Sequence, residues 1–249
     1  MTSQIVEAEE LLQPFFRKLN RRDRIGPEEQ RALAEAAEDR LVYAAGEDLV
    51  VEGERPTRSM LVTSGFTCRY RTLPDGQRQL TAIHLPGDFV DLHSFLLKEM
   101  DHSVGALSPT TIITFPHERL VKLTERFPHL TRLLWLLTLL DGSTHREWLV
   151  GMGRLSAQER VAHLFCEVYA RLSSIGFASD YRFNLPITQA ALADAVGIST
   201  VHVNRVLQEL RMGGYISWDG GQLVIQDWDR LVALAQFNDR YLHLVQEPR

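Results

Sequence analysis

The chain has 249 residues, with 27 Lys and Arg against 32 Asp and Glu, and 45% of its residues are hydrophobic. This length suits one large or two modest domains, and the composition excludes a disordered, collagen-like or purely coiled-coil chain. Two cysteines, Cys68 and Cys166, are too few for a disulfide scaffold, a four-thiolate metal site or an iron-sulfur cluster within one chain. The formal net charge of −5 argues, at first, against a nucleic-acid partner.

Two further absences set the expected location. The longest apolar block, residues 133–140, is far shorter than the ~20 residues of a membrane span. The first residues contain no basic segment followed by an apolar one, so no signal peptide is predicted. We therefore expect a cytoplasmic protein with no membrane partner.

The first half of the chain changes character near residue 40. Residues 11–37 have a polar helical pattern with a basic cluster, which is typical of a solvated helix face. Short apolar runs punctuated by Gly, Pro and Asp follow as far as residue 115, and they predict strands at 60–62, 69–71 and 80–83. Short strands at near-regular spacing predict an antiparallel β-roll of the jelly-roll type.

A long amphipathic helix is predicted next, between about residues 130 and 155. Asp141 and the three residues after it weaken the pattern of one straight rod. The apolar stripe is either core or a dimer seam, and we expect both uses on different faces. The residues predicted to form the dimer seam are Leu130, Leu133, Leu137, Leu140 and Trp148.

The most informative stretch is residues 185–211. Thr188 is placed to cap a short helix, Gly197 to form the turn, and Ser199 to cap a second helix with an apolar inward face. Small residues, a turn glycine and two apolar faces together predict a helix-turn-helix. Ser156 and Glu159 form a capping box that starts the preceding helix, so a hinge is predicted just before it.

A turn of Asp and two Gly at 219–221 separates two short apolar runs and predicts a two-stranded hairpin, followed by a helix capped by Asp227. A helix-turn-helix with a hairpin is a winged helix. The predicted fold class is α+β, with a β-roll at 1–127, a long helix and hinge at 128–155, and a winged helix-turn-helix domain at 156–249.

In a helix-turn-helix the second helix enters the major groove of DNA. Arg205 matches the acceptors of guanine, and Val201 or the Thr200 methyl group matches a thymine methyl. Hydroxyls and helix amino ends suit phosphates. The predicted DNA-binding residues are Thr188, Gln189, Ser199, Thr200, Val201, His202, Asn204 and Arg205. Taken alone, Arg205 is equally well explained as a solvated helix residue.

The charge of residues 156–249 is unusual for a DNA-binding domain, because it combines eight Arg and no Lys with ten Asp and Glu. The usual footprint is basic. Helix amino termini and hydroxyls would supplement the few cations, so we expect DNA affinity with a shallow salt dependence.

With these motifs the chain resembles the Crp/Fnr superfamily of bacterial transcription regulators. The resemblance rests on the glycine-punctuated roll, the long helix, the hinge at 154–162 and the winged helix at 185–225. It implies a homodimer, a cyclic-nucleotide-binding-like sensor, binding to a near-palindromic promoter, and contact with RNA polymerase. Val201 replaces a glutamate that is common in the family, so the half-site is expected to differ.

The resemblance also identifies a candidate effector pocket, in which cyclic-nucleotide sensors carry an Arg for the cyclic phosphate. Here Asp101 and His102 stand in that segment, and an Asp would repel a phosphate. We therefore predict no response to cyclic AMP. The candidate pocket residues are Asp88, Asp91, His93, Asp101 and His102.

Other chemistry is weakly supported. No nucleophile elbow, phosphate loop or paired-carboxylate motif is present, so an enzyme is not expected. The histidines have no close metal-ligand spacing, and neither a metal nor a cofactor is predicted. Cys68 is either core filler or a redox switch. The alternative functions are a ligand- or haem-dependent sensor whose DNA binding is conditional on an effector, and an interaction protein that binds no DNA.

Overall fold

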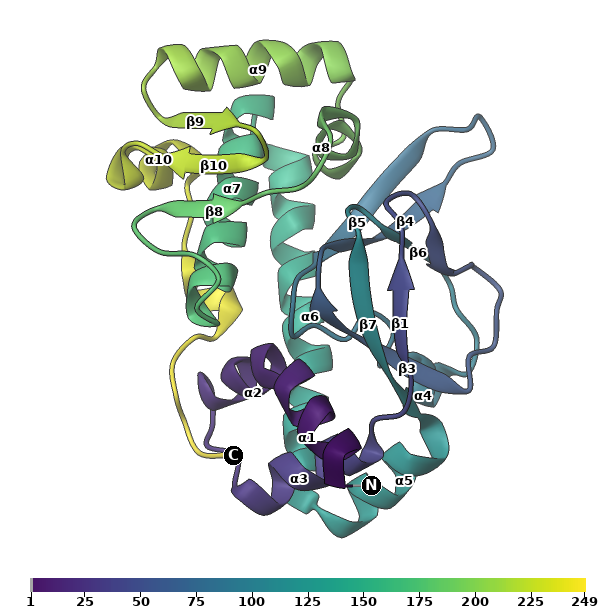
Figure 1. The fold of residues 1–249 in the computed structure, drawn as a ribbon. Coiled ribbons are helices and arrows are strands. Elements are labelled where there is room, and N and C mark those ends of the chain that lie inside the picture. Colours follow the sequence, from purple (N-terminus) through teal and green to yellow (C-terminus); the bar gives the residue numbers. More distant parts are fainter. Residues whose placement is uncertain (1) are drawn as a thin grey trace. The chain divides into compact units, whose positions relative to one another are not determined.

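The structure is a computed structural model that describes residues 2–249, with side chains described from Ile5 onward. Its contacts divide the chain into two compact units (Figure 1). Unit 1 runs to Tyr70 and includes Ile83–Asp141 and Val245–Arg249, and unit 2 comprises Arg71–Ala82 and Gly142–Leu244. Among the described residues, none of the helices is both long enough and apolar enough to span a bilayer.

Unit 1 opens with three helices, α1 (Thr2–Leu11), α2 (Gln13–Asn20) and α3 (Pro27–Ala36). The start of α3 is defined by Gly26, whose N–H donates to the Glu29 carboxylate at 2.8 Å. Phe15 and Leu33 are fully buried, so α2 and α3 each turn one apolar face inward.

The basic cluster near α2 is only in part the solvated face that the sequence predicts, since Arg17, Arg21 and Arg24 are exposed. Lys18 forms an ion pair with Asp88, and the Arg22 guanidinium donates to the carbonyl oxygen of Lys18 at 3.0 Å. Arg22 is only 5% exposed. The prediction was wrong for these two cations, because the carboxylate that pairs with Lys18 lies 70 residues away in the sequence and Arg22 turns back to bond the Lys18 carbonyl oxygen.

Two antiparallel sheets form the roll, with strand orders β1-β7-β3 and β2-β6-β4-β5. The strands are β1 (Arg40–Tyr43), β2 (Asp48–Val50), β3 (Arg58–Ser64), β4 (Thr67–Thr72), β5 (Arg78–His84), β6 (Ser103–Ala106) and β7 (Thr110–Pro116). The strands predicted at 60–62, 69–71 and 80–83 lie within β3, β4 and β5, so these predictions are confirmed.

A hydrophobic cluster joins the two sheets, with Val62 and Ile112 from one sheet and Val50 and Val104 from the other. The turn from β3 to β4 requires Gly65, which has a φ of +82°. A Cβ atom at this position would lie 2.3 Å from the carbonyl oxygen of Pro109. Any other residue would therefore be strained and would collide with backbone.

Three further helices complete this region of the chain: α4 (Ser94–Leu97), α5 (His117–Arg126) and α6 (Pro128–Arg154). α6 is one continuous helix of 27 residues, so residues 141–144 do not interrupt it. One face of its first half is buried against α2, α3 and the β3 and β7 strands. This hydrophobic cluster is the core of unit 1.

Unit 2 is built on α7 (Ala157–Ser174). The predicted capping box is confirmed, because Ser156 Oγ accepts from the Glu159 N–H at 3.3 Å and the Glu159 carboxylate accepts from the Ser156 N–H at 2.6 Å. The other elements are β8 (Arg182–Asn184), α8 (Gln189–Val196), α9 (Thr200–Met212), β9 (Ile216–Asp219), β10 (Gln222–Ile225), α10 (Trp228–Ala235) and the 3-10 turn η1 (Asp239–Leu242).

The predicted hairpin is present as β9 and β10, but the sheet has a third strand and the order β8-β10-β9. β8 has three residues, and Phe183 pairs with Leu223 of β10. The two-stranded prediction was incomplete because so short a strand has too few alternating residues to produce a pattern. The predicted cap of α10 is confirmed, since Asp227 accepts from the Arg230 N–H at 3.1 Å.

A buried carboxylate organises the interior of unit 2. Glu167 is fully buried on α7 and accepts hydrogen bonds from Trp148 Nε1 at 2.9 Å, the Tyr241 hydroxyl at 2.8 Å and Arg171 at 2.9 Å. Burying a charge is costly unless it is paired and hydrogen-bonded, and this group is both. It therefore ties α6, α7 and η1 together inside one unit.

The last residues of the chain return to unit 1. The Arg249 N–H donates to Asp23 Oδ2 at 2.6 Å, and the Glu247 N–H donates to the carbonyl oxygen of Arg22 at 2.8 Å. Backbone N–H groups of the C-terminal residues thus bond to the segment between α2 and α3, once to a side chain and once to a carbonyl oxygen.

His129, at the start of α6, lies between two carboxylates of unit 1. Its Nδ1 is 2.7 Å from Glu29 Oε1 and its Nε2 is 3.1 Å from Asp23 Oδ2. Burial lowers the pKa of His129, but the two carboxylates outweigh burial and hold the pKa above its usual range. Burial likewise raises the pKa of Asp23, while His129 and two backbone N–H groups lower it to a net value below the usual one.

We expect the substitution His129→Gln to destabilise the protein in a pH-dependent way. A histidine whose folded pKa is raised contributes stability that is fully present below its unfolded pKa, near 6.5, and is lost as the pH rises through the folded value. Near pH 5.5 the variant should lose about 1 kcal/mol of unfolding free energy, and the loss should shrink above pH 8. Urea unfolding between pH 5 and pH 9 measures this, with the exposed His243→Gln as control. An equal loss at every pH would contradict the ion-pair role.

Candidate DNA-binding interface

The helix-turn-helix of unit 2 consists of α8 and α9, and both of its predicted caps are confirmed. Thr188 Oγ1 accepts from the Ala191 N–H at 3.1 Å, and Ser199 Oγ accepts from the His202 N–H at 3.2 Å. Each cap satisfies an N–H group that the first turn of a helix leaves without a partner. The two helix starts are therefore fixed by residues visible in the sequence.

The turn between the two helices depends on Gly197, which has a φ of +66° and ends α8 in the left-handed conformation. A Cβ atom there would lie 2.4 Å from Cε of Met152. Glycine takes this conformation without the steric cost that a side chain brings. The turn conformation and the contact with Met152 of α6 therefore both require glycine at this position.

The inward face of α9 is fully buried, as predicted. Val203, Val206, Leu207 and Leu210 are all at most 2% exposed. Because these side chains anchor α9 on unit 2, the opposite face is presented to solvent. The sequence predicted this division from spacing alone.

The outward face of α9 gathers the predicted base-reading residues. Val201 is 81% exposed, and Thr200, Asn204 and Arg205 are also exposed. The Arg205 side chain is 67% exposed, and its Nε lies 3.9 Å from Glu209 Oε1 one turn further along. An exposed pair of this kind is weak, so the guanidinium remains available to a ligand.

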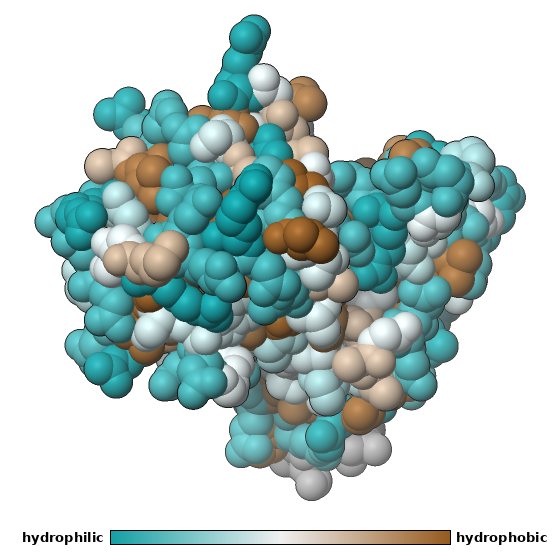
Figure 2. All heavy atoms as spheres, turned by 90° about the horizontal axis from the view of Figure 1, so that it is seen from above, coloured by the Kyte–Doolittle hydropathy of each residue, from teal (hydrophilic) through white to brown (hydrophobic). Residues whose placement is uncertain are grey.

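The remaining predicted residues lie beside this face. Thr188 and Ser199 are exposed at the two helix starts, while Gln189 and His202 are partly buried. Figure 2 looks down on this side of the molecule and shows mostly hydrophilic side chains with isolated hydrophobic ones. All eight predicted DNA-binding residues therefore lie on α8, on α9 or at their N-caps.

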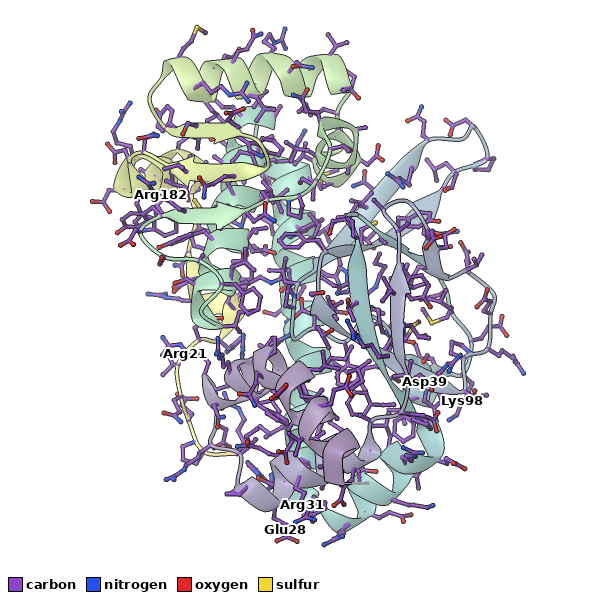
Figure 3. All side chains as sticks on the ribbon, in the orientation of Figure 1. Arg21, Glu28, Arg31, Asp39, Lys98 and Arg182 are labelled. Atoms are coloured by element: carbon purple, nitrogen blue, oxygen red, sulfur yellow. The ribbon has the colours of Figure 1, made fainter. Side chains whose placement is uncertain are left out.

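The wing is tied to the end of α9 by contacts that the sequence did not predict. Arg211 Nη2 donates to the carbonyl oxygen of Trp218 in β9 at 3.2 Å. The Arg230 guanidinium lies 4.6 Å from the centre of the Tyr215 ring. No spacing signal links these pairs, since helix, turn and strand bring them together. Figure 3 labels Arg182, an exposed cation of the same sheet.

The five residues of the candidate effector pocket do not act as one group. Asp88 pairs with Lys18 and accepts from the Leu85 N–H at 2.8 Å. Asp91 is fully buried and accepts from the Met60 N–H at 2.6 Å. The Asp91 carboxylate thus holds the backbone of β3, and the Asp88 carboxylate holds the backbone just after β5.

The other three pocket residues, His93, Asp101 and His102, are brought together. The His93 and His102 rings are 4.9 Å apart between centres, and His102 Nδ1 lies 2.5 Å from Asp101 Oδ1. Burial, reinforced by the charge of Arg69, lowers the pKa of His93 to about 4 and lowers that of His102 as well. Both rings are therefore neutral near pH 7.

The predicted dimer seam requires correction. Leu130, Leu133, Leu137 and Leu140 are at most 8% exposed and belong to the core of unit 1. Trp148 donates its indole N–H to Glu167 inside unit 2. A partner chain cannot reach the four leucines without disrupting the core that buries them, and the Trp148 indole N–H is already bonded within its own chain. The helical stripe was correctly identified, but its leucines serve the chain's own core.

Both cysteines are buried free thiols. Cys68 on β4 is 1% exposed, which fits core filler better than a redox switch. Burial raises the pKa of the Cys166 thiol, so this group is an inert one.

Comparison with known proteins agrees with this geometry. Residues 159–234 match the model of the Crp-like helix-turn-helix domain, and residues 40–127 match that of the cyclic nucleotide-binding domain. Together, fold and site define a DNA-binding transcription regulator with a sensor-type roll. The chain belongs to the Crp/Fnr superfamily, whose members are transcription regulators and not enzymes.

Its relatives include two regulators of known name. The nitrogen fixation regulation protein FixK of Bradyrhizobium diazoefficiens is 31% identical over 196 residues, which cover 79% of this chain and 81% of the relative. The transcriptional activator protein FnrL of Cereibacter sphaeroides is 26% identical, with 78% and 79% covered. The solved structure of FixK2 from Bradyrhizobium japonicum superposes with a TM-score of 0.72 at 27% identity, covering 80% of this chain and 96% of that one.

We expect Arg205→Ala to weaken binding to the preferred DNA site by about 1–3 kcal/mol and to relax the preference at one base pair. Exposed Arg182, outside the helix-turn-helix, provides the control Arg182→Ala, which should leave every base preference unchanged. Binding isotherms on a panel of single-base variants measure both effects. An equal loss on all sequences would indicate a phosphate contact instead of a base contact.

Proposed function

We propose that the protein binds near-palindromic promoter DNA as a homodimer, with α9 of each copy in the major groove. The observation that carries this proposal is the division of α9 into a buried face and a solvent face. The solvent face carries Val201 and Arg205, which suit a thymine methyl and the guanine acceptors. The buried face fixes the orientation of that surface on unit 2.

Phosphate contacts are assigned to the helix starts. Thr188 and Ser199 stand at the amino ends of α8 and α9, where backbone N–H groups and the helix dipole favour an anion. Residues 156–249 have eight Arg and no Lys against ten Asp and Glu, so few cations are available to neutralise phosphates. The proposed affinity therefore depends on placed hydrogen bonds more than on bulk charge.

The dimer contact is assigned to the exposed stripe of α6. Trp135, Leu139 and Leu149 are 66%, 54% and 74% exposed, although each is a large apolar residue. Positions 135, 139, 142, 146, 149 and 153 repeat at steps of four and three, and all of them are exposed except Gly142, which is half-buried. This is the spacing of a two-helix seam, and Gly142 and Gly153 leave room for close approach.

The roll is not proposed as a cyclic AMP site. His102 and Asp101 occupy the segment in which cyclic-nucleotide sensors carry an arginine, and Asp101 brings a negative charge where a phosphate would bind. Like charges at contact distance repel. Since relatives are named transcriptional activators, we also propose that the DNA-bound dimer contacts RNA polymerase.

Selection of bound fragments from random DNA tests the proposed function. Purified full-length protein should enrich a two-fold symmetric site with half-site centres one helical turn, about 34–36 Å, apart. The slope of log affinity against log salt should be shallow for a dimeric binder, because few phosphates are neutralised by cations. Enrichment of single, unpaired half-sites would contradict the dimer, and no enrichment would contradict sequence-specific binding.

We expect Leu139→Asp to convert the protein to monomers, because it places a charge in the centre of the apolar stripe. Sedimentation equilibrium gives the mass, and binding to the selected site should weaken at least tenfold because two half-sites are no longer held together. Leu73, half exposed in the turn after β4, provides the matched control Leu73→Asp.

The substitution Trp148→Phe distinguishes the exposed stripe of α6 from the dimer seam predicted from the sequence, which includes Trp148. It removes one donor from buried Glu167 and should lower the free energy of unfolding by about 1–3 kcal/mol, while leaving the dimer mass unchanged. If Trp148→Phe were monomeric while Leu139→Asp kept the dimer mass, the dimer contact would lie on the face predicted from the sequence instead.

A further inference from the structure

The segment between β5 and β6 in unit 1 brings together three groups that bind metal ions in proteins. One imidazole nitrogen of His93, one of His102 and a carboxylate oxygen of Asp101 all lie within 4.8 Å of one another. The two histidines are nine positions apart in the sequence, so no close metal-binding motif indicates the site. Imidazole and carboxylate together suit divalent ions of the zinc and iron type.

Two nitrogen atoms in this cluster are buried without a hydrogen-bond partner among the described residues. They are Nε2 of His93 and Nε2 of His102, and only 9% of the His102 side chain is exposed. Buried polar atoms normally have a hydrogen-bond partner. An exception calls for an explanation, such as a bound water molecule or ion. Two such atoms on adjacent rings therefore point to a shared ligand.

Asp101 determines which nitrogen of His102 is free to bind. Its Oδ1 lies 2.5 Å from Nδ1 of His102, so that nitrogen carries the proton and Nε2 carries the lone pair. A carboxylate that orients a histidine in this way is the usual partner of a metal-binding imidazole.

The backbone holds both histidines in place. His93 is the N-cap residue of α4, two positions after the fixed carboxylate of Asp91. On the other side, Met100 is buried, accepts from the Gly53 N–H at 2.8 Å and donates its N–H to the carbonyl oxygen of Glu54 at 2.9 Å. Lys98, labelled in Figure 3, ends α4 between these anchors. The separation of the two rings is therefore set by ordered backbone.

The charges around the cluster permit a cation. The positive charge of Arg69 acts on both histidines, and its Nη1 lies 2.9 Å from the Asp141 carboxylate, which compensates that charge. The Asp101 side chain is 77% exposed, so one side of the cluster is open to solvent and carries a negative charge. An ion at the cluster thus has a counter-charge beside it.

We propose that His93, His102 and Asp101 form a binding site for one divalent transition-metal ion in unit 1. Nε2 of each histidine ligates the ion, Asp101 orients His102 and supplies negative charge, and water completes the coordination. This site is additional to the proposed DNA-binding function and does not depend on it.

Titration of the metal-free, full-length protein with Co²⁺ tests the site, because Co²⁺ takes zinc-type sites and absorbs visible light there. We expect one equivalent of Co²⁺ to bind per chain and to give visible absorption bands typical of Co²⁺ with four or five ligands. Addition of Zn²⁺ should displace the Co²⁺ and remove these bands. His93→Gln and His102→Gln should each weaken binding at least 100-fold, and Asp101→Asn should weaken it about 10–100-fold. The exposed His243→Gln is the matched control and should bind as the parent protein does.

Absence of bands, or equal binding by the parent protein and both histidine variants, would overturn the proposal. Uptake of hemin in place of Co²⁺, with a Soret band that His93→Gln abolishes, would also overturn it by assigning the group to haem. Circular dichroism and thermal unfolding identify any variant that fails to fold. If a histidine variant does not fold, Asp101→Asn tests the site instead, because the substituted side chain is exposed. Because the titration contains no DNA, its failure is distinguishable from failure of promoter binding.

Discussion

The burial of one leucine face of α6 in the core of unit 1 is the interaction on which the rest of the structure depends. Leu133 and Leu137 pack with residues of α2, α3, β3 and β7. Because this face is occupied, the rotation of α6 about its axis is fixed, and the opposite stripe must face solvent. The same continuous helix then supplies Trp148 to the buried Glu167 of unit 2. One helix thus provides core, exposed stripe and a structural hydrogen bond from different faces.

Much of the fold could be predicted from the sequence because its signals are local. Ser156, Thr188 and Ser199 cap helices within three residues of their partners, and Gly197 allows a turn through its own backbone freedom. The face of α9 follows from 3.6-residue periodicity. In each of these cases, cause and effect lie within one or two helical turns.

The parts that could not be predicted involve partners distant in the sequence. Lys18 finds Asp88 only when the roll has formed, and the face of α6 that meets the core depends on α2 and α3. Periodicity identifies an apolar stripe but not its occupant. The approach of His93 to His102 likewise depends on how the loop between β5 and β6 closes. For the candidate DNA-binding interface, by contrast, the residues are nearly contiguous, so sequence reasoning assembled them correctly on one surface.

The return of the C-terminal residues to Asp23 and Arg22 has a consequence for how the protein unfolds. Residues 142–244 of unit 2 are flanked on both sides by segments of unit 1. While unit 1 stays folded, an unfolded unit 2 is a closed loop of about a hundred residues instead of a free tail. Closing a loop reduces the entropy of the unfolded chain, so hydrogen bonds of the C-terminal residues inside unit 1 also stabilise unit 2. Cleaving the chain before residue 245 would remove that restraint while leaving every contact inside unit 2 intact.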